Sequence, residues 1–246
     1  MSTRAADGVR DYFLARTCDL TPVGVRRDSS VLYAPFSDIH EMSVLCTAVL
    51  SDTERQRMER LATDKQRAEF AQRRAFRRFC AATALDGRRN LSKIVFEETE
   101  KGRPFLAEAP TSWFSFSSCR FGMLGAWSVT CAVGVDIEDD TRNAEVRALA
   151  REFFTRDEAA RVEQAASADR PAVFYQLWSL KEAALKSIGE GLPFGLDTFA
   201  FELLSSPRVT LAPAEFGGPG RFRAYRLGQG NLNGALVTRM PAGTIC

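Results

Sequence analysis

VGVDIED, residues Val133–Asp139, alternates apolar and acidic residues, a pattern typical of a β-strand with one buried face. Successive side chains of a strand point to opposite faces, so Asp136 and Glu138 share one face, about 7 Å apart, while Val135 and Ile137 point into the core. Two such carboxylates repel each other unless a hard cation lies between them, and Mg²⁺ prefers oxygen ligands. The stretch predicts either a metal site or two solvent-facing acids on an edge strand.

A helical pattern follows about 40 residues later, in FYQLWSLKEAALK, residues Phe174–Lys186. Apolar side chains recur there every three or four residues, which predicts a helix that ends at Gly189. Lys181 falls within the apolar stripe, where its amine must reach solvent or pair with a carboxylate or a phosphate. Glu182 and Lys186 lie four residues apart, and an ordinary surface ion pair explains them as well as a functional role does. It does not explain Lys181.

The same order of elements occurs in both halves of the chain, a strand region followed by helices and then by strands. This order predicts an α+β fold, a pseudo-dimer of two similar halves, residues 1–122 and 123–246, with the active site in the cleft between them. The expected helices span residues 51–85, 145–164 and 171–188, and the expected strands span residues 31–36, 94–97, 105, 113–117, 123–130, 133–138, 198–204, 208–211, 221–227 and 235–239.

The first expected helix is rich in arginine from Arg55 to Arg78, with acidic residues and phenylalanines interspersed. This pattern fits a solvated charged face, a phosphate site, or a surface for an acidic partner, because arginine forks match phosphate oxygens. The net charge of the whole chain is only +2, which argues against a nucleic-acid-binding protein.

Two weaker motifs follow that helix. Lys101-Gly102-Arg103-Pro104 predicts a turn, in which Gly102 permits close backbone approach and Pro104 stiffens the chain. The segment SWFSFSS, residues Ser112–Ser118, predicts a strand that offers hydroxyl groups at its end.

The composition excludes several kinds of site. The 246 residues contain one histidine, His40, so multi-histidine zinc and iron centres are impossible. The six cysteines form no CxxC pair and are expected to be buried thiols of a reducing cytoplasm. We see neither a secretory signal nor a membrane-spanning run, and we expect a cytoplasmic protein with no membrane partner.

Taken in order, these segments resemble the Sfp type of 4′-phosphopantetheinyl transferases. That family shows a G-[KR]-P turn, an F-N-x-S-H-S strand end, a G-[IV]-D-x-E strand, an FFxxxE helix start and a W-x-x-K-E-x-x-x-K helix. The corresponding segments here are Gly102–Pro104, Phe114–Cys119, Gly134–Glu138, Phe153–Glu158 and Trp178–Lys186. The resemblance covers roughly residues 65 to 200, and the ordered pair GVDIE and WSLKEAALK is its most specific part.

The resemblance implies an enzyme that transfers the phosphopantetheine arm of coenzyme A to a serine of an apo acyl or peptidyl carrier protein, releasing adenosine 3′,5′-bisphosphate. It also implies a monomer. By the same resemblance Asp136, Glu138 and Glu182 hold Mg²⁺, Glu182 acts as the base directly or through water, and Lys186 neutralises or protonates the leaving phosphate. The implied coenzyme A contacts are Arg67, Arg74, Lys101, Gly102, Arg103, Pro104, Ser117, Ser118, Asp136, Lys181 and Lys186.

One position departs from the family pattern. Ser118 stands where the family usually has a histidine, and a hydroxyl offers a neutral hydrogen bond in place of a charge. The departure leaves two outcomes open: weaker binding of coenzyme A, or compensation by an arginine. It also motivates an alternative function, a non-catalytic module that binds coenzyme A or a carrier protein.

Overall fold

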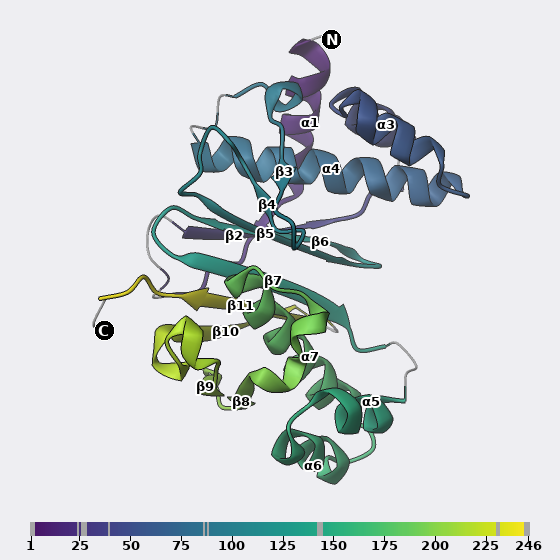
Figure 1. The fold of residues 1–246 in the computed structure, drawn as a ribbon. Coiled ribbons are helices and arrows are strands. Elements are labelled where there is room, and N and C mark those ends of the chain that lie inside the picture. Colours follow the sequence, from purple (N-terminus) through teal and green to yellow (C-terminus); the bar gives the residue numbers. More distant parts are fainter. Residues whose placement is uncertain are drawn as a thin grey trace.

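The computed structural model describes residues 3–23, 25, 29–38, 40–85, 87, 89–141, 145–229 and 232–243. Its helices and strands form an α+β fold, as predicted from the sequence (Figure 1). From one side to the other, the layers are helices, a first sheet, a second sheet and helices again.

The first sheet has the strand order β1-β2-β6-β5 with antiparallel neighbours. Its strands are β1 (Cys18–Asp19), β2 (Ser29–Pro35), β5 (Trp113–Cys119) and β6 (Gly122–Ser128). A small hairpin of β3 (Glu97–Glu98) and β4 (Pro104–Phe105) precedes β5. The helices on this side are α1 (Thr3–Arg16), α2 (His40–Ala48), α3 (Asp52–Glu59) and α4 (Asp64–Leu85). The apolar face of α4 packs on the sheet, because Ala75, Phe76 and Phe79 recur at helical spacing and are buried.

The second sheet has the order β10-β11-β7, formed by β7 (Ala132–Asp139), β10 (Phe222–Gln229) and β11 (Leu232–Arg239). Helices α5 (Val146–Phe153), α6 (Arg156–Gln164) and α7 (Arg170–Ile188) accompany it. A hairpin of β8 (Ala200–Glu202) and β9 (Arg208–Leu211) follows. Gly189 ends α7 in the left-handed conformation with φ of 78°, as predicted.

A third core lies between the two sheets and joins them. Val31 and Leu124 of the first sheet pack there with Val135 and Ile137 of β7. The strands β5 and β7, each at the edge of its sheet, lie side by side, and the amide of Val135 donates to Ser115 Oγ at 3.0 Å. Strand β7 is therefore covered on one face by the first sheet and on the other by α7.

At Gly134 the strand β7 and the helix α7 are in close contact. A Cβ at this position would lie 1.9 Å from the carbonyl oxygen of Ala183 and 2.5 Å from the amide nitrogen of Ser187. We expect Gly134→Ala to lower the free energy of unfolding by about 3 kcal/mol, as overpacking does in a rigid core. Urea unfolding measures this loss. The control is Gly228→Ala in β10, where an added Cβ meets nothing within 4 Å; equal stability of both variants would contradict the prediction.

Several expected elements differ in detail. The expected helix 51–85 is two helices. A capping box of Ser51 and Glu54 starts α3, which ends at Glu59, and a second helix, α4, begins at Asp64. The expected helix 145–164 also divides, at the capping box of Thr155 and Glu158. Residues 94–96 form no strand. Helices α1 and α2 were not predicted. Cys246, one of the cysteines counted in the sequence, lies outside the described residues.

No helix in the described part of the chain combines the length and the hydrophobicity that crossing a bilayer requires.

Candidate functional site

Helix α7 brings Lys186 onto β7. Its ammonium nitrogen lies 2.7 Å from Asp136 Oδ1 and 3.2 Å from the carbonyl oxygen of Val135. The main contact of Lys186 is therefore with Asp136 of β7, and not the i,i+4 ion pair with Glu182 that the spacing in the sequence allows. The close packing at Gly134 makes the contact between helix and strand possible.

Asp136 is a buried carboxylate with one satisfied oxygen and one orphaned oxygen. Its Oδ1 accepts hydrogen bonds from Lys186 Nζ and from Ser117 Oγ, the latter at 2.7 Å. Its Oδ2 is buried and has no hydrogen-bond partner in the described structure. A buried carboxylate oxygen without a partner is costly unless a ligand completes it, so Asp136 has an open position for a cation or a donor.

Glu182 is half-buried one helical turn before Lys186. Burial raises the pKa of this carboxyl, the Lys186 ammonium opposes that rise, and the nearby Asp136 carboxylate adds to it. Among the described residues Glu182 makes neither a hydrogen bond nor an ion pair. A desolvated carboxyl without a partner is a stronger base than an exposed one.

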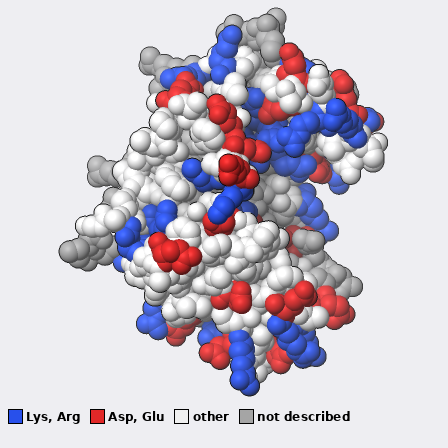
Figure 2. Space-filling model, viewed as in Figure 1, with Lys and Arg blue, Asp and Glu red and all other residues white. Residues whose placement is uncertain are grey.

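Glu182 and Lys186 line a cavity of about 210 Å³ between the halves. The other walls come from the turn at residues 101–104, from Phe114, Ser115 and Phe116 of β5, from Arg77 of α4, and from Gly189, Glu190 and Gly191 after α7. Figure 2 shows Lys and Arg side chains gathered over α3 and α4, next to the hollow between the two halves. Such a surface attracts anionic ligands.

The turn predicted at Lys101–Pro104 joins β3 to β4 and borders this cavity. Gly102 adopts φ of 81°, and its amide donates to the carbonyl oxygen of Thr99 at 2.8 Å. Lys101 pairs with Glu190, and the Arg103 guanidinium lies over the Trp113 ring, 4.1 Å from its centroid. Burial lowers the pKa of Arg103. The sequence thus correctly predicts a turn here, and the structure places it on the cavity that Glu182 and Lys186 also line.

The end of β5 presents two faces. Ser115 and Ser117 point toward β7, where they bind the backbone of Val135 and the carboxylate of Asp136. Phe116 and Ser118 belong to the opposite face by the alternation of the strand. Ser117 and Ser118 both line a second cavity of about 290 Å³, together with Arg73, Phe76, Arg77, Phe116, Met123 and Leu124.

Lys181 does not reach either cavity, which corrects its predicted contact with coenzyme A. Its side chain is 0% exposed and its ammonium lies 2.6 Å from Glu158 Oε2. The same ammonium donates to the carbonyl oxygens of Leu196 and Phe199. These contacts use all three donors of the amine. Of the partners expected from the sequence, Lys181 therefore binds a carboxylate and not a phosphate.

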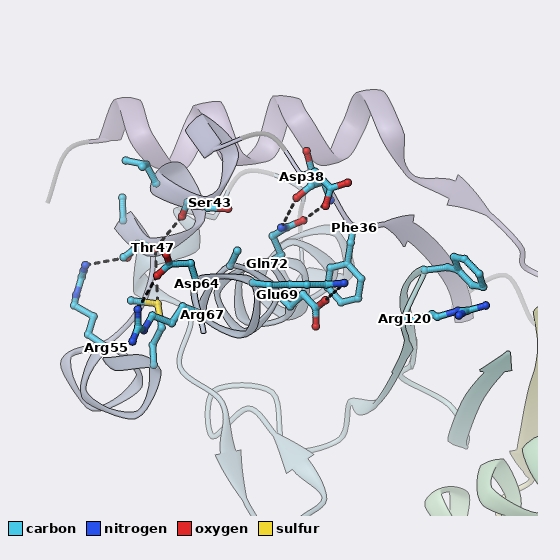
Figure 3. A pocket seen from close by; sticks show the side chains of 17 residues that line it. Phe36, Asp38, Ser43, Thr47, Arg55, Asp64, Arg67, Glu69, Gln72 and Arg120 are labelled. Carbon is cyan, nitrogen blue, oxygen red and sulfur yellow. Dashed lines mark hydrogen bonds and ion pairs between the residues drawn. The ribbon is translucent and has the colours of Figure 1, made fainter. Parts of the chain in front are cut away.

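Arg67 and Arg74 are compensated by acids and lie outside the cavity that holds Glu182. Arg67 bonds Asp64 at 2.7 Å in a larger cavity of about 930 Å³ between α2, α3 and α4 (Figure 3). Arg74 lies 3.7 Å from Glu54 Oε1 and over the ring of Phe70. The structure gives no support to either as a ligand contact.

Arg77 lines both cleft cavities and was missed by the sequence analysis. No local signal separates it from its neighbours on α4. Among the described residues it differs from Arg73, Arg74 and Arg78 in forming no direct ion pair, and that depends on α3, whose Glu54 pairs with Arg74 and Arg78 instead.

The described residues contain no group of three or more Asp, Glu, His or Cys side chains arranged to hold a metal ion. The structure therefore does not bring Asp136, Glu138 and Glu182 together as a ready-made site. Glu138 is half-buried on the strand and does not line the cavity. The orphaned Oδ2 of Asp136 and the mutual repulsion of Asp136 and Glu182 still fit a cation bound with help from a ligand.

Comparison with solved structures finds a holo-acyl-carrier-protein synthase from Neisseria meningitidis. It is 18% identical, with a TM-score of 0.36, and the match covers 45% of this chain and 98% of that chain. A likeness at this level supports no inference about the present chain.

Sequence comparisons are more informative. The model of the 4′-phosphopantetheinyl transferase superfamily matches residues 132–239. A 4′-phosphopantetheinyl transferase of Bacillus pumilus is 30% identical over 152 residues, which is 62% of this chain and 64% of the relative, less than two thirds of its length. An L-aminoadipate-semialdehyde dehydrogenase-phosphopantetheinyl transferase of Schizosaccharomyces pombe is 30% identical over 187 residues, 67% of this chain and 71% of that relative. Identity of this degree, over this much of both chains, shows that the chain belongs to the 4′-phosphopantetheinyl transferase superfamily.

Proposed function

We propose that this chain transfers the 4′-phosphopantetheine arm of coenzyme A to a serine of an apo acyl or peptidyl carrier protein and releases adenosine 3′,5′-bisphosphate. Support comes from the family and from one observation above all. Glu182 and Lys186 of α7 line a cavity between the halves, and Lys186 reaches the buried Asp136 of β7. The turn predicted to border the adenine forms another wall of that cavity.

The proposed reaction needs a base and a charge for the leaving group. The serine oxygen of the carrier attacks the phosphorus on the pantetheine side of the diphosphate. The bond from that phosphorus to the bridging oxygen breaks, and adenosine 3′,5′-bisphosphate leaves with the electron pair. Glu182 takes the serine proton, directly or through a water, and Lys186 places a positive charge beside the departing phosphate.

We propose Mg²⁺ as the metal of this site, with Asp136, Glu138 and Glu182 as its protein ligands. When bound, it would neutralise negative charge on the diphosphate oxygens. Support comes from the orphaned buried Oδ2 of Asp136. The described residues contain no ready-made three-acid group, so we propose that these acids gather only when the phosphates of bound coenzyme A, which proteins commonly use as Mg²⁺ ligands, complete the site.

We also propose that the chain works as a cytoplasmic monomer made of two duplicated halves. In support, one long helix packs on each sheet, α4 on the first and α7 on the second. Because β6 pairs with β2 and β5, we place the junction of the halves in the turn after β6 instead of at residue 122. The five described cysteines are free, which agrees with a reducing compartment.

A direct assay tests the activity. The chain is incubated with coenzyme A, MgCl₂ and apo carrier proteins of fatty acid, polyketide and peptide synthesis, and each carrier is weighed by mass spectrometry. We expect at least one carrier to gain one phosphopantetheine, with loss of the reaction in EDTA and recovery in excess MgCl₂. Coenzyme A binding without any mass gain would favour the non-catalytic module, and the absence of both would contradict the proposal.

A further inference from the structure

Arg77 stands out among the arginines of α4 by its position. It contributes to the cavity that holds Glu182 and Lys186 and to the adjoining cavity that holds Ser117 and Ser118. Its guanidinium lies over the ring of Phe116, 5.2 Å from the centroid. The side chain is thus fixed on β5 at the boundary between the two spaces.

Arg77 also differs from its neighbours in charge compensation. Arg73 pairs with Glu69, while Arg74 and Arg78 pair with Glu54. Within the residues that the structure describes, Arg77 makes neither an ion pair nor a hydrogen bond. Burial and the positive charges of Arg74 and Arg73 lower the pKa of Arg77 to about 10, although the more distant carboxylates of Glu98 and Glu54 oppose this shift. The group still carries its charge at neutral pH, so among the described residues a desolvated cation faces the cleft without a carboxylate in direct contact.

Ser118 lies on the same side of β5 as this cation. Strand alternation puts Ser118 on the face of Phe116, and both residues line the second cavity with Arg77. A serine hydroxyl there supplies one neutral donor, whereas the guanidinium supplies several donors and a permanent charge. Together the two groups offer the positive charge and the hydrogen-bond donors that binding of a phosphate requires.

We infer that Arg77 and Ser118 form a phosphate site between α4 and β5, in which Arg77 provides the charge that Ser118 lacks. Given the proposed function, on which this step rests, the phosphate belongs to coenzyme A. Arg77 then makes the contact that was expected of Arg67 or Arg74, because those two are already compensated by Asp64 and Glu54.

Calorimetry on the full chain tests the site with three probes: coenzyme A, 3′-dephospho-coenzyme A and inorganic pyrophosphate. We expect Arg77→Gln to weaken binding of coenzyme A about 10- to 100-fold, the effect of losing a charged hydrogen bond in a desolvated site. Arg77→Lys, which keeps the charge, restores part of the affinity. The matched control is Arg147→Gln, an exposed arginine of α5 that loses the same charge; its affinity stays at the wild-type value.

The melting temperature without ligand separates a binding role from a structural one. An uncompensated, partly buried cation destabilises the free chain, so Arg77→Gln should melt at or above the wild-type temperature. A lower melting temperature would make the side chain structural and overturn the inference. If Arg77→Gln loses affinity for coenzyme A but not for 3′-dephospho-coenzyme A, Arg77 binds the 3′-phosphate. If the variant loses affinity for both and for pyrophosphate, Arg77 binds the diphosphate.

The inference and the proposed function can fail separately. If the wild type transfers phosphopantetheine and Arg77→Gln binds coenzyme A with unchanged affinity, the phosphate site at Arg77 is refuted and the function stands. If the wild type binds pyrophosphate through Arg77 but neither binds nor transfers from coenzyme A, the phosphate site stands and the function fails.

Discussion

Glu182→Gln is expected to reduce carrier modification by about 10²- to 10⁴-fold, the usual contribution of a general base. The amide has the shape of the carboxyl but cannot accept the serine proton, and it is a poorer ligand for Mg²⁺. The fold should be unaffected, because Glu182 makes neither a hydrogen bond nor an ion pair among the described residues and is repelled by Asp136. The neutral variant should therefore melt no lower than the wild type.

The measurement is the rate of mass gain on a carrier that the wild type modifies, at saturating coenzyme A. The control is Glu152→Gln, an exposed glutamate of α5 far from the cavity in sequence, which should keep the wild-type rate. Near-normal turnover of Glu182→Gln would remove Glu182 from the mechanism. A large drop in melting temperature would instead show that the side chain supports the fold.

The strand β7 and the helix α7 could each be predicted from the sequence, since both carry strong periodic patterns. Alternation correctly places Val135 and Ile137 in a core, and Asp136 on the opposite face. It does not show that the opposite face is also covered. Asp136 is only 4% exposed because α7 packs over it, so the alternative of a solvent-facing acid is wrong for this residue. Burial of both faces depends on a helix some 35 residues away, which no local pattern reveals.

The sequence of helix α1 contains an apolar pattern from which this helix could be predicted. Ala6, Val9 and Phe13 recur at helical spacing and are all buried in the first core. The roles of Arg77 and Lys181 could not be predicted in this way, because they depend on which acidic side chains lie near them in the folded chain. Glu54 reaches α4 from α3, and Glu158 reaches α7 from α6. Such partners are set by tertiary packing and cannot be read from the spacing of charges along one helix.

The buried pair of Lys181 and Glu158 leads to a second large expected effect, this time on stability. The ammonium is enclosed, and the carboxylate also accepts from the amide of Phe201 at 2.9 Å and from Thr155 Oγ1 at 2.6 Å. Glu158 thus ties the start of α6 to α7 and to β8. Removing one partner leaves the other as an uncompensated buried charge, which costs about 3–5 kcal/mol.

We therefore expect Lys181→Met to lower the free energy of unfolding by about 3–5 kcal/mol in urea titrations. The double variant Lys181→Met with Glu158→Gln should recover a large part of that loss, because a neutral amide can still accept from Phe201 and no lone charge remains. The folded fraction of Lys181→Met should keep its KM for coenzyme A, since the amine faces Glu158, Leu196 and Phe199 and not the cavity. A variant of normal stability with a raised KM would return Lys181 to the role of a phosphate ligand, because only a contact with coenzyme A produces that combination.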